Sequence, residues 1–382
     1  MKAAILGFGT VGRGTYEALR DSRSGLTVKK VLDIYVPKGY EELVTTDFND
    51  ILFDSEITVV AECMGGLHPA YEYVTACLEK GKSVVSSNKY LICTYYRELT
   101  LLAERNGCLL RYTPAVGGGI PWLNNLKRIR RCDEILSFRG IVNGTTNYIL
   151  DAMQTRSFPF ADALRVAQEL GYAEADPTSD LNGADARRKC AISANIAFDT
   201  ILDEDDIPTF GIENITDRDV AAFRDMGLTA RLIASAARTP EGISARVEPV
   251  LFEPSALEAT IHINYNCITL FAERTGQLSL IGQGAGKDPT GCSLANDMLD
   301  AAYDTRREKH IFPEDIPPTD KRTVKERYYI RCSDDLGAFG FSSPEEGIYI
   351  TGEMCLEDIH SLHDNLKDKS AFIASIDKEV SA

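Results

Sequence analysis

The first 112 residues alternate between short apolar runs and amphipathic segments. Apolar runs of strand length occur at "KAAILG", "LTVKKVLDI", "ITVVAE", "SVVSS" and "CLLRY". Between them, "TVGRGTYEALRDS", "PAYEYVTACLEKG" and "TYYRELTLLAERNG" have helical spacing, and the last of these ends at Gly107. Strands that alternate with helices of this length predict a parallel sheet that is covered on both faces.

The pattern changes at "TPAVGGGIPW", residues 113–122, where three glycines flanked by prolines predict a hinge-like loop and a domain boundary. Beyond it we expect a strand at "EILSFRGIV", a helix at "GTTNYILDAMQ" and further helices to about residue 238. Antiparallel strands at "ISARVEPVLF" and "IHINYNCITLF" follow. The pattern predicts an α/β domain over 1–120 and an α+β region over 121–287. A helix near 288–306 and an acidic tail over 311–382 complete the chain.

Charge and cysteine usage narrow the class of protein. The 382 residues have room for two domains, and the formal net charge of −16 argues against a nucleic-acid partner. No apolar run is long enough for a signal peptide or a membrane span, so no membrane partner is expected. Ten cysteines occur without any C-x-x-C spacing, which is typical of a reducing compartment, and we expect a cytoplasmic protein.

The hexapeptide "GFGTVG" directly follows the first predicted strand and opens a helix. In this context Gly7 permits a tight turn, Gly9 allows close approach of a pyrophosphate, and Gly12 allows the helix to pack on the strand. The motif therefore predicts a dinucleotide site, although a βα turn without a ligand is an alternative. Asp33, at the distance of a ribose-binding acid, favours NAD over NADP, whereas Lys38 offers an NADP-like contact. Asp33 is alternatively only a turn residue at the end of a strand.

Several longer motifs appear in order along residues 1 to about 310. They are "GFGTVG", "SSNKYL", "AVGGGIP", "GIVNGTTNYIL", "GYAEADPTSDLNGADARRK" and "GQGAGKDPTG". Together they resemble homoserine dehydrogenases. The resemblance implies reversible, nicotinamide-dependent interconversion of L-homoserine and L-aspartate 4-semialdehyde in threonine and methionine biosynthesis. It also implies a Rossmann nucleotide-binding domain, to which the helix after "GQGAG" returns, an α+β catalytic and dimerisation region, and a homodimer.

The resemblance also assigns roles to individual residues. Lys189 matches the group that exchanges a proton at the substrate oxygen, and Asp185, one helical turn earlier, matches its partner there. Glu174 matches the acid that holds the substrate ammonium, with Asp180 lining the same pocket. Lys89 matches a second active-site lysine beside the nicotinamide. The dinucleotide contacts implied are Gly7, Phe8, Gly9, Thr10, Val11, Gly12, Asp33, Ser86, Lys89 and Gly284.

Each of these residues also has a simpler interpretation. Asp185 and Lys189 at i and i+4 alone would be read as an exposed helix pair that contributes roughly 0.3 kcal/mol. Glu174 alone would be a loop acid, and Lys89 a surface lysine at a strand end. "NGTTNY" is suited to capping a helix, and we expect that it does so and also borders the pocket.

The chain departs from the family in two places. Similar proteins carry an acid near a monovalent-cation site where Thr113 stands here; the backbone carbonyls of Val116, Gly118 and Ile120 are the remaining candidates to hold Na⁺ or K⁺. Longer relatives end in a threonine-sensing ACT domain. "KERYYIRCSDDLGAFG", residues 325–340, resembles its opening, and the short tail predicts a truncated or diverged remnant.

A related oxidoreductase with another small hydroxy or semialdehyde substrate, or a non-catalytic dinucleotide sensor, is the alternative function.

Overall fold

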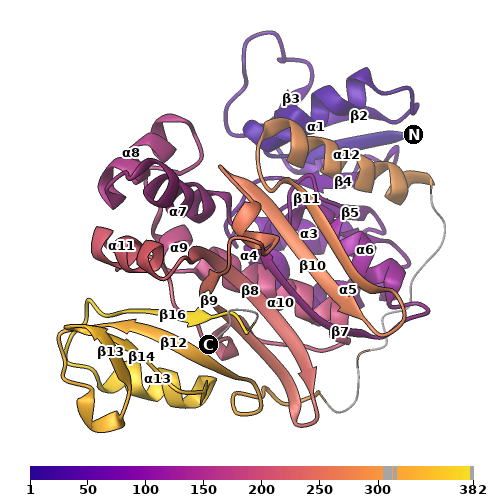
Figure 1. Ribbon diagram of the computed structural model, residues 1–382. Coiled ribbons are helices and arrows are strands. Elements are labelled where there is room, and N and C mark those ends of the chain that lie inside the picture. The colour runs from indigo at the N-terminus through magenta and orange to yellow at the C-terminus, as the bar shows by residue number, and fades with distance from the viewer. Residues whose placement is uncertain (304–311, 313–315, 379–382) are drawn as a thin grey trace. The chain divides into compact units, whose positions relative to one another are not determined.

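The structure is a computed structural model that describes residues 1–303, 312 and 316–378. The chain forms two compact units (Figure 1). Unit 1 comprises Met1–Arg131, Asn195–Ile201 and Gly282–Glu314, and unit 2 comprises Cys132–Ala194, Leu202–Ile281 and Asp315–Ala382. The predicted helix near 288–306 and the predicted tail over 311–382 both include positions outside the described residues. Within those residues, no helix combines the length and the apolar character needed to cross a membrane.

Unit 1 contains a six-stranded parallel sheet in the order β3-β2-β1-β4-β5-β6. This is the Rossmann-type order, in which the chain reverses direction across the sheet between β1 and β4. Its strands are β1 (Lys2–Leu6), β2 (Thr27–Leu32), β3 (Val44–Thr45), β4 (Ile57–Glu62), β5 (Ser83–Ser86) and β6 (Leu110–Arg111). Its helices are α1 (Thr10–Asp21), α2 (Asn49–Leu52), α3 (Ala70–Glu79), α4 (Lys89–Thr94), α5 (Tyr96–Arg105), the 3₁₀ turn η1 (Thr113–Ala115), α6 (Trp122–Ile129) and α12 (Lys287–Tyr303).

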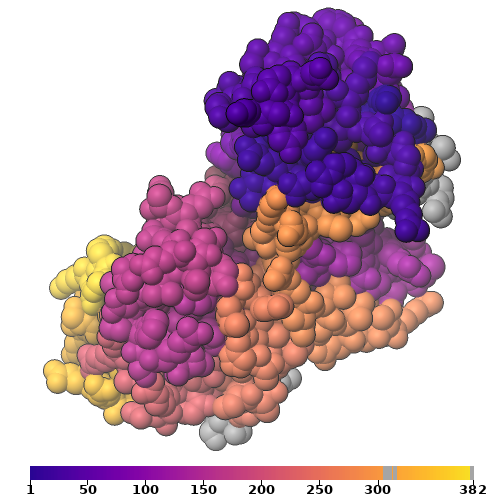
Figure 2. Space-filling view, turned by 90° about the horizontal axis from the view of Figure 1, so that it is seen from above, coloured from indigo at the N-terminus to yellow at the C-terminus, as the bar shows by residue number. Residues whose placement is uncertain are grey.

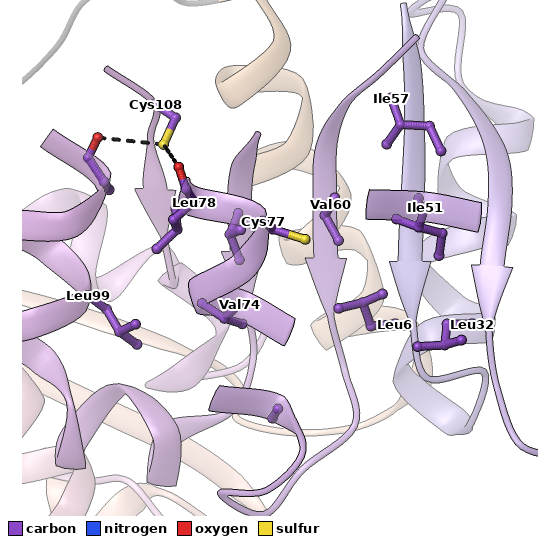
Figure 3. Packing of buried hydrophobic residues seen from close by; sticks show 14 of the residues in the cluster. Leu6, Leu32, Ile51, Ile57, Val60, Val74, Cys77, Leu78, Leu99 and Cys108 are labelled. Atoms are coloured by element: carbon purple, nitrogen blue, oxygen red, sulfur yellow. Dashed lines mark hydrogen bonds between the residues drawn. The ribbon is translucent and has the colours of Figure 1, made fainter. Parts of the chain in front are cut away.

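The sheet of unit 1 is buried on both faces, as the apolar runs predict. On one face, strand residues such as Leu6 and Val60 pack against Val74 and Leu78 of α3 and Leu99 of α5 (Figure 3). The alternate residues of the same strands form a second cluster on the other face, because successive side chains of a strand point to opposite sides. The strands therefore lie at the centre of the unit, and only their ends are available to a ligand.

Helix α12 packs directly against α1, and the ion-paired residues Lys287 and Glu17 of the two helices are 270 residues apart in the sequence. A Cβ placed on Gly14 would lie 2.3 Å from the backbone oxygen of Lys287, and one on Gly291 would lie 2.5 Å from the backbone of Gly14. The two helices therefore cross at glycines. In the space-filling view, orange atoms of the α12 region lie against the indigo atoms of the N-terminal segment (Figure 2).

Unit 2 is built around a mixed sheet, which in the described residues has the order β11-β10-β7-β8-β9-β16-β12-β14-β13, with β15 paired to β12. Its strands are β7 (Ile135–Ile141), β8 (Thr229–Thr239), β9 (Gly242–Phe252), β10 (Tyr265–Ala272), β11 (Gly276–Gln283), β12 (Lys325–Arg331), β13 (Ser342–Glu345), β14 (Ile348–Ile350), β15 (Met354–Cys355) and β16 (Phe372–Ile376). Its helical segments are α7 (Gly144–Arg156), α8 (Phe160–Glu169), α9 (Thr178–Leu181), α10 (Ala184–Phe198), η2 (Glu204–Asp206), α11 (Asp217–Asp225), η3 (Glu258–Thr260), η4 (Gly337–Phe339) and α13 (Leu356–Asn365).

The expectation of helices to about residue 238 is wrong in its last ten residues. The helical run ends with α11, and residues 229–239 form β8, which pairs with β7 on one side and β9 on the other. This segment, "TARLIASAART", is rich in alanine, a strong helix former. Its position in the middle of a sheet, where small side chains pack between layers, overrides that preference.

The C-terminal segment from β12 to β16 adds to the same sheet. Strand β16 pairs with β9 in parallel and with β12 in antiparallel orientation, so the segment continues the sheet of unit 2. Helix α13 covers the strands of this segment (Figure 1). The ten cysteines are present as thiols; six are buried, whereas Cys132 and Cys292 are exposed.

Candidate active site

Asp185 and Lys189 form a buried ion pair in the first turns of α10. The Lys189 Nζ lies 2.7 Å from an oxygen of Asp185, and only 11% of the lysine side chain and 6% of the aspartate side chain are exposed. The helix begins after Gly183, whose φ of +84° is readily adopted by glycine. The interpretation of these two residues as an exposed surface pair is therefore wrong. Each residue of such a buried pair depends on the other, because loss of one partner leaves an uncompensated buried charge.

The residues at the junction of β7 and α7 complete this cluster. The backbone oxygen of Val142 accepts a hydrogen bond from the Lys189 Nζ at 2.6 Å. Asn143 caps α7, as predicted for "NGTTNY", because its Oδ1 accepts from the backbone N–H of Thr146 at 2.9 Å. Its Nδ2 donates to Asp185 at 2.8 Å and to Asp180 at 2.7 Å. Sequence reasoning did not single out Asn143; its signal was a cap residue directly after a strand.

Asp180, on the short helix α9, is the second acid of the cluster. Burial raises its pKa above the usual range, and the negative charge of Asp185 raises it further. The hydrogen bond from Asn143 and the positive charge of Lys189 oppose that rise. The cluster thus links one cation, two acids and one amide in a chain of hydrogen bonds, which suits a small polar substrate that carries charges of both signs.

Glu174 lies outside this hydrogen-bonded cluster. Its side chain is exposed, on the turn that follows α8, and its backbone oxygen accepts a hydrogen bond from Gln168 at 3.1 Å. Nearby, Thr145 donates to the backbone oxygen of Tyr172 at 2.5 Å, which ties the start of α7 to this turn. Of the two acids predicted to hold the substrate, the structure joins Asp180 to Asp185 and leaves Glu174 facing solvent.

The glycine loop of unit 1 has the local geometry expected of a dinucleotide site. A Cβ placed on Gly12 would lie 2.0 Å from the backbone oxygen of Gly7, so only glycine lets α1 begin this close to the loop. At Gly9 a Cβ would meet no atom within 4 Å, which leaves the backbone open to a ligand. Thr10 and Val11 form the first turn of α1, which carries no acidic residue. These features fit a pyrophosphate at a helix N-terminus.

Asp33 is held against the glycine loop. Its carboxylate accepts the backbone N–H of Phe8 at 2.5 Å and that of Tyr35 at 3.0 Å. The Phe8 ring is buried and makes edge contacts with Tyr16 and Tyr40. Asp33 therefore fixes the conformation of the loop through these two hydrogen bonds.

Ser86 and Lys89 lie at the carboxyl ends of the strands, where ligands bind in open parallel sheets. Ser86 donates to Glu62 at 2.6 Å, and these residues are partners in the register of β4 and β5. Glu62 is completely buried, and burial raises its pKa. Lys89 is half-buried at the start of α4, directly after the cap residue Asn88. Sequence reasoning missed Glu62, although an acid that ends an apolar strand beside Ser86 was a usable signal.

The predicted cation loop and the second glycine-rich turn are adjacent in unit 1. A Cβ on Gly118 would lie 2.5 Å from the backbone of Gly284, and Gly118 has a φ of +54°. The Ile120 oxygen accepts the backbone N–H of Trp122 at 2.7 Å. Thr113, where the family resemblance leads us to expect an acid, donates its N–H and its hydroxyl to Asp297 of α12 at 2.8 and 2.7 Å. Among the described residues, no group of three His, Cys, Asp or Glu side chains is placed to hold a metal.

Comparisons with known proteins agree with these features. The family described as homoserine dehydrogenase matches residues 121–299, and the homoserine dehydrogenase NAD binding domain matches residues 7–113. A Bacillus subtilis homoserine dehydrogenase is 36% identical over 315 residues, which cover 78% of this chain and 72% of that relative. One from Corynebacterium glutamicum is 39% identical over 316 residues, covering 78% and 71%. The crystal structure of a Thiobacillus denitrificans homoserine dehydrogenase superposes with a TM-score of 0.88 at 29% identity, covering 99% and 98% of the two chains.

Proposed function

Because this chain belongs to the homoserine dehydrogenase family, we propose that its Lys189–Asp185 pair acts at the reacting oxygen of L-homoserine and L-aspartate 4-semialdehyde. As a member of the family the chain is an oxidoreductase of threonine and methionine biosynthesis that uses a nicotinamide dinucleotide and a small-molecule substrate. The observation that carries the proposal is the burial of the pair beside Asn143 and Asp180.

Lys189 exchanges the proton in this proposal. Oxidation of an alcohol to an aldehyde removes one hydride from carbon and one proton from oxygen, and hydride transfer is the chemistry that the dinucleotide supplies when bound. An ammonium at the oxygen stabilises the developing negative charge during reduction and can donate the proton. Asp185, at 2.7 Å from the Nζ, orients the lysine in the buried site.

The two remaining acids bind the ammonium group of the amino-acid substrate. Asp180 supports this role because it is hydrogen-bonded into the cluster. Glu174 supports it through the family resemblance of its motif and its exposed position near the start of α7. A zwitterionic substrate requires fixed charges of both signs, and the cluster contains both.

The dinucleotide is held by residues of unit 1. We assign this role to Gly7, Phe8, Gly9, Thr10, Val11, Gly12, Asp33, Ser86, Lys89 and Gly284. A carboxylate at the ribose position disfavours a 2′-phosphate, so Asp33 favours NAD, while Lys38 is the group that would favour NADP. We further propose that a monovalent cation is bound by carbonyls of Val116, Gly118 and Ile120, and that the protein is a homodimer.

A steady-state assay tests these roles together. Purified protein is incubated with L-homoserine and either NAD or NADP, with and without Na⁺ or K⁺, and nicotinamide reduction is followed by absorbance. We expect homoserine-dependent reduction that falls by about 10²–10⁴-fold in Lys189→Met and is unaffected by Lys367→Met, a matched change at an exposed lysine. Cofactor binding without turnover of homoserine would instead support a dinucleotide sensor, and turnover of another hydroxy compound a related oxidoreductase.

A further inference from the structure

The Asn143 side chain donates hydrogen bonds to two carboxylates that come from different segments of the chain. Its Nδ2 carries two hydrogens, and the structure directs one to Asp180 at 2.7 Å and one to Asp185 at 2.8 Å. The residue is only 4% exposed, so solvent does not replace these donors. Both acids lie more than 35 residues from Asn143 in the sequence, so the contacts are made by tertiary packing.

The orientation of the amide is determined by the helix that it caps. Asn143 Oδ1 accepts the backbone N–H of Thr146 at 2.9 Å, and an N–H cannot be bonded by the NH₂ side of the amide. The NH₂ side must therefore face the acids. One residue thus couples the first turn of α7 to the geometry of Asp180 and Asp185.

The neighbouring backbone completes the arrangement on the lysine side. Val142, the residue before Asn143, accepts the Lys189 Nζ at 2.6 Å, and Lys189 in turn pairs with the same Asp185 oxygen that accepts from Asn143. The end of β7 therefore holds the cation through a carbonyl and both acids through an amide.

We propose that Asn143 is a positioning residue for the reaction, which holds Asp180 and Asp185 at a fixed spacing so that Asp185 orients Lys189 while Asp180 is directed toward the substrate. This inference rests on the proposed function of the cluster. Without the amide, the two acids are left to repel each other, and one of them must move away or take up a proton.

Substitutions at Asn143 separate its positioning role from its role as a helix cap. Asn143→Ser keeps a good N-cap acceptor but removes the NH₂ donor, and Asn143→Asp keeps the cap and the shape but replaces the donor by a third acid. Thr216→Ala removes the cap of α11 elsewhere in unit 2 and serves as the control for stability loss alone. We expect kcat/KM for homoserine to fall by about 30-fold in Asn143→Ser, and further in Asn143→Asp, while Thr216→Ala retains wild-type kinetics.

The pH dependence gives a readout that a merely structural role would not move. Asp180 is faced by Asp185 and Lys189 of α10, by Asn143 and by Thr145 of α7. Asp185 raises its pKa, whereas Asn143, Lys189 and Thr145 lower it, and the hydrogen bond from Asn143 is the largest of these lowering effects. In Asn143→Ser the acidic limb of the kcat/KM profile should therefore move to higher pH. An unchanged limb together with near-wild-type kcat/KM would overturn the proposal.

A measurement without turnover keeps this test independent of the proposed function. The carboxyl ¹³C signal of Asp180, followed by NMR through a pH titration of the whole protein, should report a higher pKa in Asn143→Ser than in the wild type. If the wild type showed no homoserine turnover, the proposed function would fail while this titration still decided the role of Asn143. Identical titrations in the two proteins would refute it.

Discussion

Removal of the Lys189 ammonium should destabilise the protein as well as inactivate it. In Lys189→Met the Asp185 carboxylate loses a partner at 2.7 Å in a site where its own side chain is 6% exposed. Breaking a buried ion pair by deleting one partner costs about 3–5 kcal/mol. We expect a value near the lower limit, about 3 kcal/mol, because the Asn143 amide continues to donate to Asp185. Activity should fall by about 10²–10⁴-fold, the usual effect of losing an acid–base group.

The size of this destabilisation should depend on pH. The pKa of Asp180 is raised by burial and by Asp185, and the charge of Lys189 opposes that rise, so Lys189→Met raises it further. An acid whose pKa is higher in the folded state binds more protons when folded. Its presence therefore costs stability as the pH rises through that folded pKa. The variant should accordingly lose more stability at about pH 8 than at about pH 4.5.

Urea unfolding followed by circular dichroism at both pH values measures these effects. The double variant Asp185→Asn with Lys189→Met removes both charges, so most of the lost stability should return, to within about 1 kcal/mol of the wild type, while activity remains lost. This separates the structural contribution of the pair from its catalytic one. Lys189→Met with the wild-type unfolding midpoint at both pH values would refute the reasoning about the buried pair.

Three further changes test other parts of the structure. In Gly211→Ala the new Cβ would lie 2.3 Å from the backbone oxygen of Leu181 in α9. We therefore expect thermal unfolding to show a stability loss of about 2 kcal/mol, together with a raised KM for homoserine. An unchanged KM would show that α9 tolerates the shift. Asp297→Ala leaves the N–H and hydroxyl of Thr113 unpaired and should lower the free energy of unfolding by about 2–4 kcal/mol. Asp297→Asn can bond both groups and should stay within about 1 kcal/mol of the wild type. Equal losses for the two variants in chemical denaturation would contradict this. Burial, assisted by the charge of a neighbouring histidine, lowers the pKa of His360 to about 4, so its neutral form is favoured in the fold and stability is lost as the pH falls below about 6.5. At about pH 5 the free energy of unfolding of His360→Phe should therefore exceed that of the wild type by about 1–2 kcal/mol. At about pH 8 the two proteins should unfold at similar midpoints.

The elements of unit 1 were predictable because their signals are local. Apolar runs of strand length alternate with amphipathic helices, and "GFGTVG" sits at the first junction, so the parallel sheet and the glycine loop followed from short windows of sequence. The two-residue strand β3 and the short helix α2 were missed, because segments of two to four residues carry too little periodicity. The expectation of helices to about residue 238 failed over β8, because the sheet into which this alanine-rich segment packs determines its conformation.

The candidate site likewise combines features that the sequence determines locally with features that depend on tertiary packing. The amino-acid order alone determines features that depend on neighbouring residues of one helix. These are the i, i+4 spacing of Asp185 and Lys189 and the capping role of Asn143. The motifs that define the family are also local and were visible in the sequence. The sequence could not show that the ion pair is buried, that Asn143 reaches Asp180 and Asp185 across 37 and 42 residues, or that Glu62 meets Ser86. Only the tertiary structure decided these, because desolvation and hydrogen-bond partners come from segments that packing brings together, and no local spacing encodes which distant segments will meet.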